Sequence, residues 1–303
     1  MGSETHEERR TGLGNIRVRG SIPVSVIVMT RNEADNIVAC LSGLSRFDEV
    51  FVVDSNSTDG TVALAASMGA RVVPFTWNGR YPKKKQWCLN HLPFRHDRVF
   101  FVDADERVLP ALADEIEALM VRGPKRAGYF VTARMSFDGH RLRFGHHNCK
   151  LALFDRKRGH FPECPDLDVT TMWEVEGHYQ PTIDGPTERL TAYMLHEDGK
   201  PVSAWFERHE LYADWEATLG FDGRLYRLAS AEPPLRRLLK RAVQRLPLRP
   251  LLAFLHSYVW RLGFLDGSAG YRYAKARGWY YRLIDRKTAA MRSLKLSPHR
   301  PTP

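Results

Sequence analysis

The stretch EVFVVDSNSTDGT, residues 49–61, decides the fold, because it joins an apolar run to a turn and to the start of a helix. Its first half is a continuous run of β-branched and aromatic residues, which is typical of a strand buried on both faces. The Asn, Ser, Asp and Gly residues that follow are turn formers, and Asp59 is placed to cap the next helix. We therefore expect a strand over residues 49–55, a turn, and a short helix over residues 61–68.

The same alternation of strands and helices extends outward from this stretch. Further apolar runs predict strands over residues 25–30, 70–75 and 98–106. Apolar residues at helical spacing follow over residues 31–44 and 110–120. Strands that alternate with helices predict βαβ units and a parallel sheet.

The pattern becomes less regular after residue 128. Strand-like segments follow over residues 128–137, 149–156 and 189–196. An aromatic-rich helical pattern then spans residues 203–228. The whole pattern predicts an α/β fold, a Rossmann-like, mostly parallel sheet flanked by helices, with a C-terminal helical extension. Three parts of the chain are expected: a flexible tail over residues 1–20, one domain over 21–230, and a basic helical region over 231–303.

Polar residues gather where three of the predicted strands end. These groups are Thr30–Glu33, Asp54 with Ser55, and Asp103–Asp105. Because the ligands of open α/β sheets bind outside the carboxyl ends of the strands, we expect the three groups to share one crevice.

The sequence FFVDADE, residues 100–106, gives the strongest indication of chemistry. Asp103 and Asp105 are one residue apart after an apolar strand, so both project to the same side of an extended chain. Paired carboxylates of this kind hold hard divalent cations, which also bridge phosphates and act as Lewis acids. The alternative is that these acids only open the following helix, where negative charge is favoured. The preceding βαβαβ pattern favours the metal site.

Two other features leave alternatives open. Asp54 either accepts hydrogen bonds from a nucleotide or serves only the turn, and its position at a strand end favours the nucleotide. The basic run PKKKQ, residues 82–86, either supplies charge to a diphosphate or forms a solvated helix start. For Lys83 and Lys84 the sequence favours these two interpretations about equally. The sequence lacks GxGxxG after the first strand, GxxxxGK[ST] and GxSxG, which removes the main support for dinucleotide-binding, P-loop and α/β-hydrolase sites.

The formal net charge of +10 is unevenly distributed along the chain. Residues 236–303 contain 16 Lys or Arg and two acidic residues and carry +14, whereas the remainder carries −4. With 43% hydrophobic and 26% charged residues, the composition argues against general disorder. Four scattered cysteines without a CxxC pair argue against a zinc module or a disulfide framework.

The basic segment combines amphipathic and aromatic stretches. Residues 235–245 place leucines on one face of a predicted helix, and residues 271–287 interleave aromatic residues with cations. Such elements are typical of membrane surfaces, where each basic residue contributes about 1 kcal/mol of attraction to anionic lipids. An anionic membrane surface is thus the expected partner of residues 235–287. Two alternatives to membrane binding are nucleic-acid binding, which we do not expect, and packing of the apolar faces on the rest of the chain.

Several segments, taken in order and spacing, resemble the family 2 glycosyltransferases of the GT-A fold. The N-terminal ones are SVIVMTRNEADNI (25–37), EVFVVDSNSTDGTVALAASMGA (49–70), KKKQ (83–86) and FFVDADERV (100–108). The downstream ones, MLHEDG (194–199), SAWFERHELYADWEA (203–217) and FLDGSAGYRYA (264–274), resemble the branch acting in lipopolysaccharide-core and exopolysaccharide synthesis. The resemblance implies a glycosyltransferase that uses a nucleotide-sugar donor and a divalent metal, Mg²⁺ or Mn²⁺.

The resemblance also implies roles for individual residues. Those expected to bind the nucleotide-sugar are Thr30, Asn32, Glu33, Asp54, Lys85, Gln86, Asp103 and Ala104. Those expected to hold the metal are Asp105, Asp103 and His196, with Asp105 as the preferred direct ligand.

Inverting transfer needs a general base that takes the proton of the acceptor hydroxyl. The stretch WEVEGHYQP, residues 173–181, offers Glu176 as the preferred candidate and Glu174 as the alternative. We expect a lipid-linked or membrane-borne glycan acceptor and an enzyme on the cytoplasmic side, peripherally bound to the inner face of the plasma membrane. The competing hypotheses are a nucleotidyltransferase of similar fold and a non-catalytic basic protein that binds nucleic acid or membrane.

Overall fold

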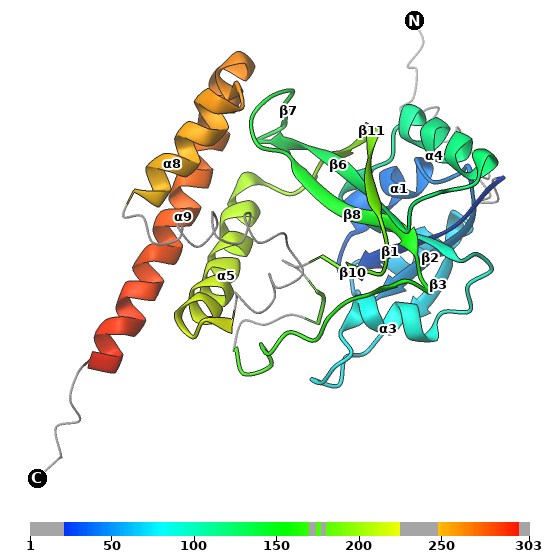
Figure 1. The fold of residues 1–303 in the computed structure, drawn as a ribbon, viewed down its shortest axis with the longest axis horizontal. Coiled ribbons are helices and arrows are strands. Elements are labelled where there is room, and N and C mark those ends of the chain that lie inside the picture. Colours follow the sequence, from blue (N-terminus) through cyan, green and yellow to red (C-terminus); the bar gives the residue numbers. More distant parts are fainter. Residues whose placement is uncertain (1–20, 170–173, 177–179, 225–247, 297–303) are drawn as a thin grey trace, which may run out of the picture.

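The computed structural model describes residues 21–169, 174–176, 180–224 and 248–296. Its centre is a mixed sheet whose neighbouring strands follow the order β3-β2-β1-β4-β8-β6-β11-β5, with β7 beside β6 (Figure 1). The predicted tail over residues 1–20 and the predicted helix over residues 235–245 lie outside the described residues, as does the boundary between residues 230 and 231, so all three stay predictions.

One half of the sheet is parallel. It contains β3 (Arg71–Pro74), β2 (Phe47–Asp54), β1 (Ile22–Thr30) and β4 (Arg98–Asp103). The register of β1 places Thr30 beside Asp54 of β2, and Met29 beside Asp103 of β4. The polar ends of these strands therefore meet at one edge of the sheet, as their sequence positions predicted.

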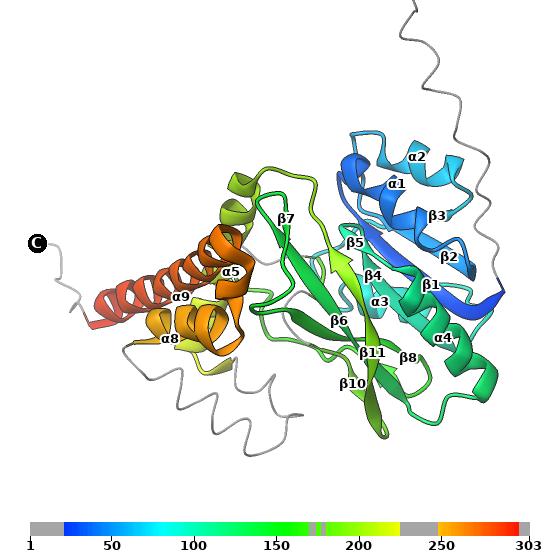
Figure 2. The ribbon, with the colours of Figure 1, turned by 90° about the horizontal axis from the view of Figure 1, so that it is seen from above.

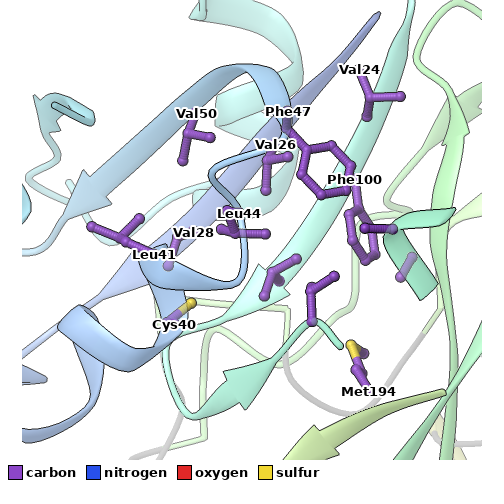
Figure 3. Close-up of a cluster of buried hydrophobic side chains, with 14 of the residues drawn as sticks. Val24, Val26, Val28, Cys40, Leu41, Leu44, Phe47, Val50, Phe100 and Met194 are labelled. Atoms are coloured by element: carbon purple, nitrogen blue, oxygen red, sulfur yellow. The ribbon is translucent and has the colours of Figure 1, made fainter. Parts of the chain in front are cut away.

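Helices cover both faces of this parallel half. One face carries α1 (Ala34–Ser42), α2 (Thr61–Ser67) and α4 (Pro110–Arg122), and the other carries α3 (Lys84–His91). Successive side chains of a strand point to opposite faces. Accordingly, Val24, Val26 and Val28 pack with α1 residues in one buried cluster (Figure 3), whereas Ile27 and Met29 pack in the cluster that includes α3. Burial on both faces explains the continuous apolar run of β1.

The predicted turn before α2 forms and links two helices. Gly60 has a φ of 89°, which glycine adopts without steric cost. The carboxylate of Asp59 accepts hydrogen bonds from the backbone N–H of Thr61 at 3.1 Å and from the backbone N–H of Ala34 at 3.0 Å. Asp59 thus supports the start of both α2 and α1, in agreement with its predicted structural role.

The other half of the sheet is mixed. It contains β8 (Asn148–Asp155), β6 (Gly128–Phe137), β11 (Thr187–His196) and β5 (Glu106–Arg107), with β7 (His140–Arg141). A separate two-stranded sheet pairs β9 (Gly159–His160) with β10 (Thr182–Ile183). β8 is antiparallel to β4 and β6, whereas β11 is parallel to β6 and antiparallel to β5. The predicted α/β fold is confirmed, with its continuous parallel run confined to the half formed by β1–β4.

Helices from the C-terminal part stand beside the sheet (Figures 1 and 2). They are α5 (Val202–Phe221), α8 (Arg249–Leu255), the π-helical turn η2 (His256–Trp260), the 3₁₀ turn η3 (Gly263–Asp266) and α9 (Gly267–Leu296). α9 packs along α5, where the rings of Trp279 and Phe206 are 4.9 Å apart. Tyr273 also contacts Phe137 of β6, with ring centroids 5.4 Å apart. The predicted C-terminal helical extension is confirmed, and part of its aromatic face packs on the domain.

Candidate active site

A cavity of about 480 Å³, within the usual size range of small-molecule sites, lies between the sheet and the helices α5 and α9. Four predicted site residues line it: Lys85, Asp103, Asp105 and His196. The two helices contribute aromatic and charged side chains, among them Trp205, His209, Tyr212, Glu216, Tyr280 and Tyr281. The cavity therefore has an acidic end at the sheet and an aromatic end at the helices.

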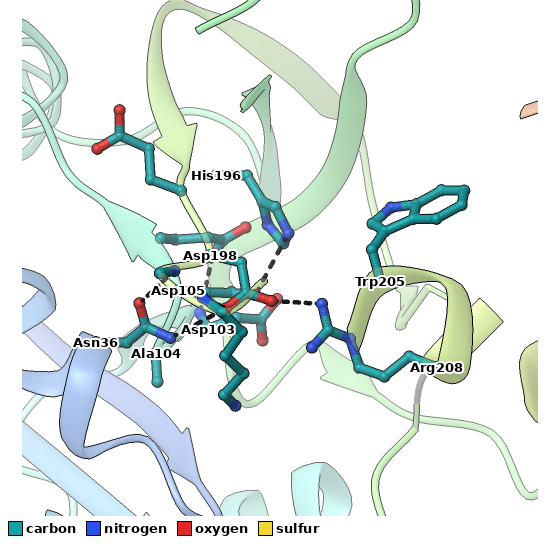
Figure 4. A network of polar contacts seen from close by, with 12 residues as sticks. Asn36, Asp103, Ala104, Asp105, His196, Asp198, Trp205 and Arg208 are labelled. Atoms are coloured by element: carbon teal, nitrogen blue, oxygen red, sulfur yellow. Dashed lines mark hydrogen bonds and ion pairs between the residues drawn. The ribbon is translucent and has the colours of Figure 1, made fainter. Parts of the chain in front are cut away.

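The acidic end depends on a short strand pairing. β5 pairs with the end of β11 and places Glu106 beside His196, and the backbone N–H of Glu197 donates to the carbonyl of Asp105 at 2.8 Å. As a result, Oδ2 of Asp105 lies 3.4 Å from Nε2 of His196 (Figure 4). The other ring nitrogen of His196, Nδ1, is buried and has no hydrogen-bond partner among the described residues.

The Asp105–His196 pair fits a divalent cation. Two neighbouring ligands of an octahedral ion, each about 2.1 Å from it, lie about 3 Å apart, so the observed 3.4 Å needs little adjustment. Within the described ranges, no group of three or more His, Cys, Asp or Glu side chains is arranged to hold a metal. Two protein ligands leave coordination positions for phosphate oxygens and water, which is the usual arrangement for Mg²⁺ with phosphate ligands.

Asp103, the third predicted metal ligand, is bound to a lysine in this structure. Nζ of Lys150, on β8, lies 2.8 Å from Asp103 and 2.5 Å from Glu106. Burial alone would lower the pKa of Lys150 and raise that of Asp103, but their mutual attraction reverses both shifts. Burial raises the pKa of Glu106 to about 7. Lys150 thus places a stable positive charge beside Asp103, and no motif in the sequence pointed to it.

Lys83 and Lys84 are buried, at 2% and 1% exposure, so the alternative of a solvated helix start is wrong for both. Nζ of Lys84 donates to the carbonyl of Thr30 at 3.0 Å and to the hydroxyl of Ser55 at 2.6 Å. Burial lowers the pKa of Lys84 to about 8. Lys83 forms an ion pair with the buried Asp166 at 2.8 Å. Lys84 therefore connects α3 to the polar ends of β1 and β2.

The preferred base candidate, Glu176, supports the start of α3. Its carboxylate accepts the backbone N–H groups of Lys85 at 2.7 Å and of Gln86 at 3.0 Å, two donors that lack partners within the helix. Glu176 is 1% exposed, and neither it nor Glu174 is among the described residues of the cavity wall. This geometry does not support Glu176 as the base, but it makes Glu176 a residue that positions Lys85.

Two of the residues predicted to bind the nucleotide are engaged in the turn that joins β2 to α2. The carboxylate of Asp54, which is 3% exposed, accepts the hydroxyl of Thr30 at 2.7 Å and the backbone N–H of Ser57 at 2.8 Å. Asn32, at a φ of 56°, accepts the backbone N–H of Thr58 at 2.9 Å. The structure brings these residues to one edge, and their contacts to a nucleotide stay predictions.

The remaining predicted donor-binding residues also have partners within the protein. Glu33 accepts Nζ of Lys200 at 2.7 Å, and burial raises its pKa although Lys200 opposes this shift. The carbonyl of Ala104 accepts a guanidinium N–H of Arg107 at 2.8 Å. The side-chain oxygen of Gln86 accepts the backbone N–H of Phe161 at 2.7 Å, so this amide fixes the loop after β9.

The aromatic end contains a carboxylate that the sequence analysis did not select. Oε2 of Glu216, on α5, accepts the hydroxyl of Tyr280, on α9, at 2.7 Å. Among the described residues of the cavity wall, Glu216 is the one carboxylate besides Asp103 and Asp105. Trp205, one face of which stacks on His209 at 3.5 Å, lies in the same wall. The helical spacing of α5 predicted the helix but not which of its residues line the cavity.

Comparison with known proteins gives the class of this chain. The family model for glycosyl transferase family 2 matches residues 25–173. A glycosyltransferase of Rickettsia prowazekii is 37% identical over 202 residues, which cover 64% of this chain and 66% of that protein. The lipopolysaccharide core biosynthesis glycosyltransferase LpsC of Rhizobium meliloti is 32% identical over 124 residues, 39% of this chain and 45% of that protein. This chain belongs to glycosyltransferase family 2, and the resemblance seen in its sequence is confirmed.

The chain is also similar to a second bacterial relative and to a solved structure. A glycosyltransferase of Rickettsia felis is 39% identical over 98 residues, so the match spans 31% of this chain and about a third of that relative, 32%. The mannosyltransferase PcManGT of Pyrobaculum calidifontis, solved with GDP-Man and Mn²⁺, aligns over 90% of this chain and 88% of that chain. Its sequence identity is 19% and its TM-score is 0.44.

Proposed function

We propose that this chain transfers a sugar, with inversion, from a nucleotide-sugar to a saccharide hydroxyl in cell-envelope polysaccharide or lipopolysaccharide synthesis. The observation that carries the proposal is the composition of one cavity, which combines Asp105, His196 and Lys85 at one end with Glu216 and aromatic side chains at the other. A donor diphosphate and an acceptor hydroxyl bound at these two ends would meet between them, which is the positioning that transfer requires.

The acidic end is suited to the diphosphate of the donor. Asp105 and His196 would hold Mg²⁺ or Mn²⁺, with Asp103 nearby, and the ion would neutralise the charge that develops on the leaving diphosphate. Lys85 and Lys150, which both line the cavity, would add positive charge on the same side. Thr30, Asn32, Glu33, Asp54, Gln86 and Ala104 are the proposed surroundings of the nucleotide.

The aromatic end is suited to the acceptor. Flat side chains such as Trp205 and Tyr212 offer apolar contact area together with a polar group. Glu216 is the carboxylate that this wall presents, and we assign to it the removal of the acceptor proton. Glu176 and Glu174, the candidates from the sequence, remain the alternatives for this role.

A thermal-shift panel of nucleotide-sugars tests the donor proposal. A nucleotide-sugar that binds the folded state raises its melting temperature, and the rise increases with affinity and concentration. We expect this rise with Mn²⁺ but not with EDTA. Nucleoside triphosphates serve as the comparison, because a nucleotidyltransferase would bind them instead. A panel in which no nucleotide-sugar binds, and none is cleaved to the nucleoside diphosphate, would contradict the proposal.

The proposed acceptor is a lipid-linked or membrane-borne glycan, with the enzyme held peripherally at the cytoplasmic face of the plasma membrane. No helix within the described residues is long and apolar enough to cross a bilayer. The helices α8, η2 and η3 nevertheless expose large apolar side chains, which we call the C-terminal apolar surface: Leu251, Leu255, Val259, Trp260, Phe264 and Leu265. Trp260 is 82% exposed, and the exposed cations Arg261 and Lys275 lie in the same part of the chain. Such a surface supports binding to anionic lipids.

Flotation with anionic vesicles tests membrane binding. Replacing Trp260 and Leu265 together by Ser is expected to weaken vesicle binding by at least about tenfold, since burying one large apolar side chain contributes about 1.5–3 kcal/mol. Val121→Ser is the matched control, because Val121 is 84% exposed but lies on α4. Equal flotation of the double variant and the wild type, or no flotation of the wild type, would reject the membrane proposal.

A further inference from the structure

The aromatic end of the cavity also carries positive charge. Arg277 of α9 and His146, in the segment before β8, both line the cavity. The ring of His256 lies next to that of His146, with ring centroids 6.0 Å apart. Burial lowers the pKa of His146 to about 3, and the charges of Arg277, His256 and Arg261 contribute to the shift in that order. The ring is therefore neutral near pH 7. Burial is the main cause of this low pKa, and the charge of Arg277 is the largest of the electrostatic contributions.

Arg277 differs from the neighbouring arginines in its partners. Arg208 in the same cavity forms an ion pair with Asp198 (Figure 4), and Arg249 pairs with Asp285 at 2.9 Å. Among the described residues, no carboxylate lies within ion-pair distance of Arg277, and its Nε, like that of Arg249, is buried without a hydrogen-bond partner. Its side chain interacts with the hydroxyl of Tyr281, which is uncharged.

The acids of the cavity do not compensate Arg277. Asp103 and Asp105 have Lys150 and His196 as partners at the other end. Glu216, the acid that α5 contributes to the described cavity wall, accepts the hydroxyl of Tyr280. A guanidinium group that is partly buried and unpaired is costly unless a ligand supplies the missing anion. Its planar set of N–H donors matches the oxygens of phosphate and carboxylate groups.

We propose that Arg277, with His146 beside it, binds an anionic group on the acceptor, a phosphate or a carboxylate attached to the saccharide. This inference rests on the proposed function, because it takes the aromatic end of the cavity as the acceptor end. It narrows the substrate class from any saccharide to an acidic or phosphorylated one.

Two successive titrations separate this inference from the proposed function. The first measures the binding of UDP and of GDP with Mg²⁺, which reports on the donor end. The second titrates inorganic phosphate, and separately acetate, into protein saturated with the nucleotide that binds, at constant ionic strength. If neither nucleotide binds, the donor is not a UDP- or GDP-sugar, and the anion titrations are run without nucleotide on the wild type and the variants.

We expect the wild type to bind phosphate or acetate, and Arg277→Gln to bind that anion at least about tenfold more weakly, as the loss of a charge-assisted hydrogen bond predicts. Stronger binding of phosphate indicates a phosphorylated acceptor, and stronger binding of acetate indicates an acidic sugar. Arg282→Gln, an exposed arginine of the same helix, is expected to behave as the wild type. Arg277→Lys retains the charge without the planar donors and is expected to bind with intermediate affinity.

Three results would overturn the inference. Anion binding that is equal in Arg277→Gln and the wild type would show that Arg277 is not the site. A loss of nucleotide affinity in Arg277→Gln would assign the arginine to the donor. A wild type that binds neither anion would exclude the site even if the variants failed to fold.

Discussion

Replacing Asp105 by Ala is expected to lower the kcat/KM of sugar transfer by at least about 100-fold, because the removal of a group that stabilises developing charge typically costs this much. Asp105 faces His196 at 3.4 Å, and together they form the proposed metal site. Without the carboxylate, His196 alone would hold the ion, and the charge of the leaving diphosphate would be poorly neutralised. The measurement is the rate of nucleoside diphosphate release in the presence of acceptor and Mn²⁺.

The control for this change is Asp114→Ala. Asp114 is an exposed carboxylate of α4 that pairs with Arg46, and exposed pairs of this kind contribute little. It is expected to keep wild-type turnover and to unfold at a similar denaturant concentration. Full transfer by a folded Asp105→Ala variant would contradict the proposed metal site.

Replacing Glu216 by Gln is expected to lower kcat by about 10² to 10⁴, the usual contribution of general base catalysis. Gln has nearly the same shape and retains an oxygen for the hydroxyl of Tyr280, so the packing of α5 on α9 should persist. The proposed donor site is at the other end of the cavity, so the affinity for the nucleotide-sugar is expected to stay unchanged. Single-turnover rates and donor titrations measure the two effects separately.

Glu176→Gln distinguishes the two assignments of the base. Glu176 accepts two backbone N–H groups at the start of α3, and the amide can accept only one of them. The variant should therefore lose about 1–3 kcal/mol of unfolding free energy and some donor affinity through Lys85, while kcat falls less than in Glu216→Gln. Glu207→Gln, at an exposed position of α5, is the control. A normal kcat in Glu216→Gln, together with a loss of kcat in a stable Glu176→Gln or Glu174→Gln variant, would assign the general base to Glu176 or Glu174 instead.

Much of the fold was predictable from local patterns. The strands β1, β2 and β4 are buried on both faces, so their apolar runs stand out against the helices between them. The place of Asp103, Asp105 and His196 in one cavity was also predicted, because the motif order matched a known family. The two-residue strand β5 pairs Glu106 with His196 and so brings His196 close to Asp105, but so short a segment leaves no periodic pattern in the sequence.

The residues missed by the sequence analysis depend on contacts between distant segments. Lys150 reaches Asp103 across 47 positions, and Glu216 reaches Tyr280 across 64. Local propensity contains no information about either pair. Similarly, the sequence offers two candidate acids close together, Glu174 and Glu176. Only the position of α3 shows that the carboxylate of Glu176 accepts backbone N–H groups of that helix. The uneven charge predicted that the C-terminal part binds a membrane surface. The packing of α9 on α5 shows in addition that some aromatic residues of α9 form part of the cavity wall.

The most direct test of the account is the metal dependence of donor binding, measured by titration of the nucleotide-sugar selected by the panel. The four conditions combine wild type or Asp105→Ala with Mn²⁺ or EDTA. We predict that Mn²⁺ strengthens donor binding at least about tenfold in the wild type and has no effect in Asp105→Ala. The reason is that Asp105 and His196 are proposed to hold one ion together, and His196 alone would remain in the variant. Donor binding that is equally tight in EDTA, or equally strengthened by Mn²⁺ in the variant, would contradict the central claim.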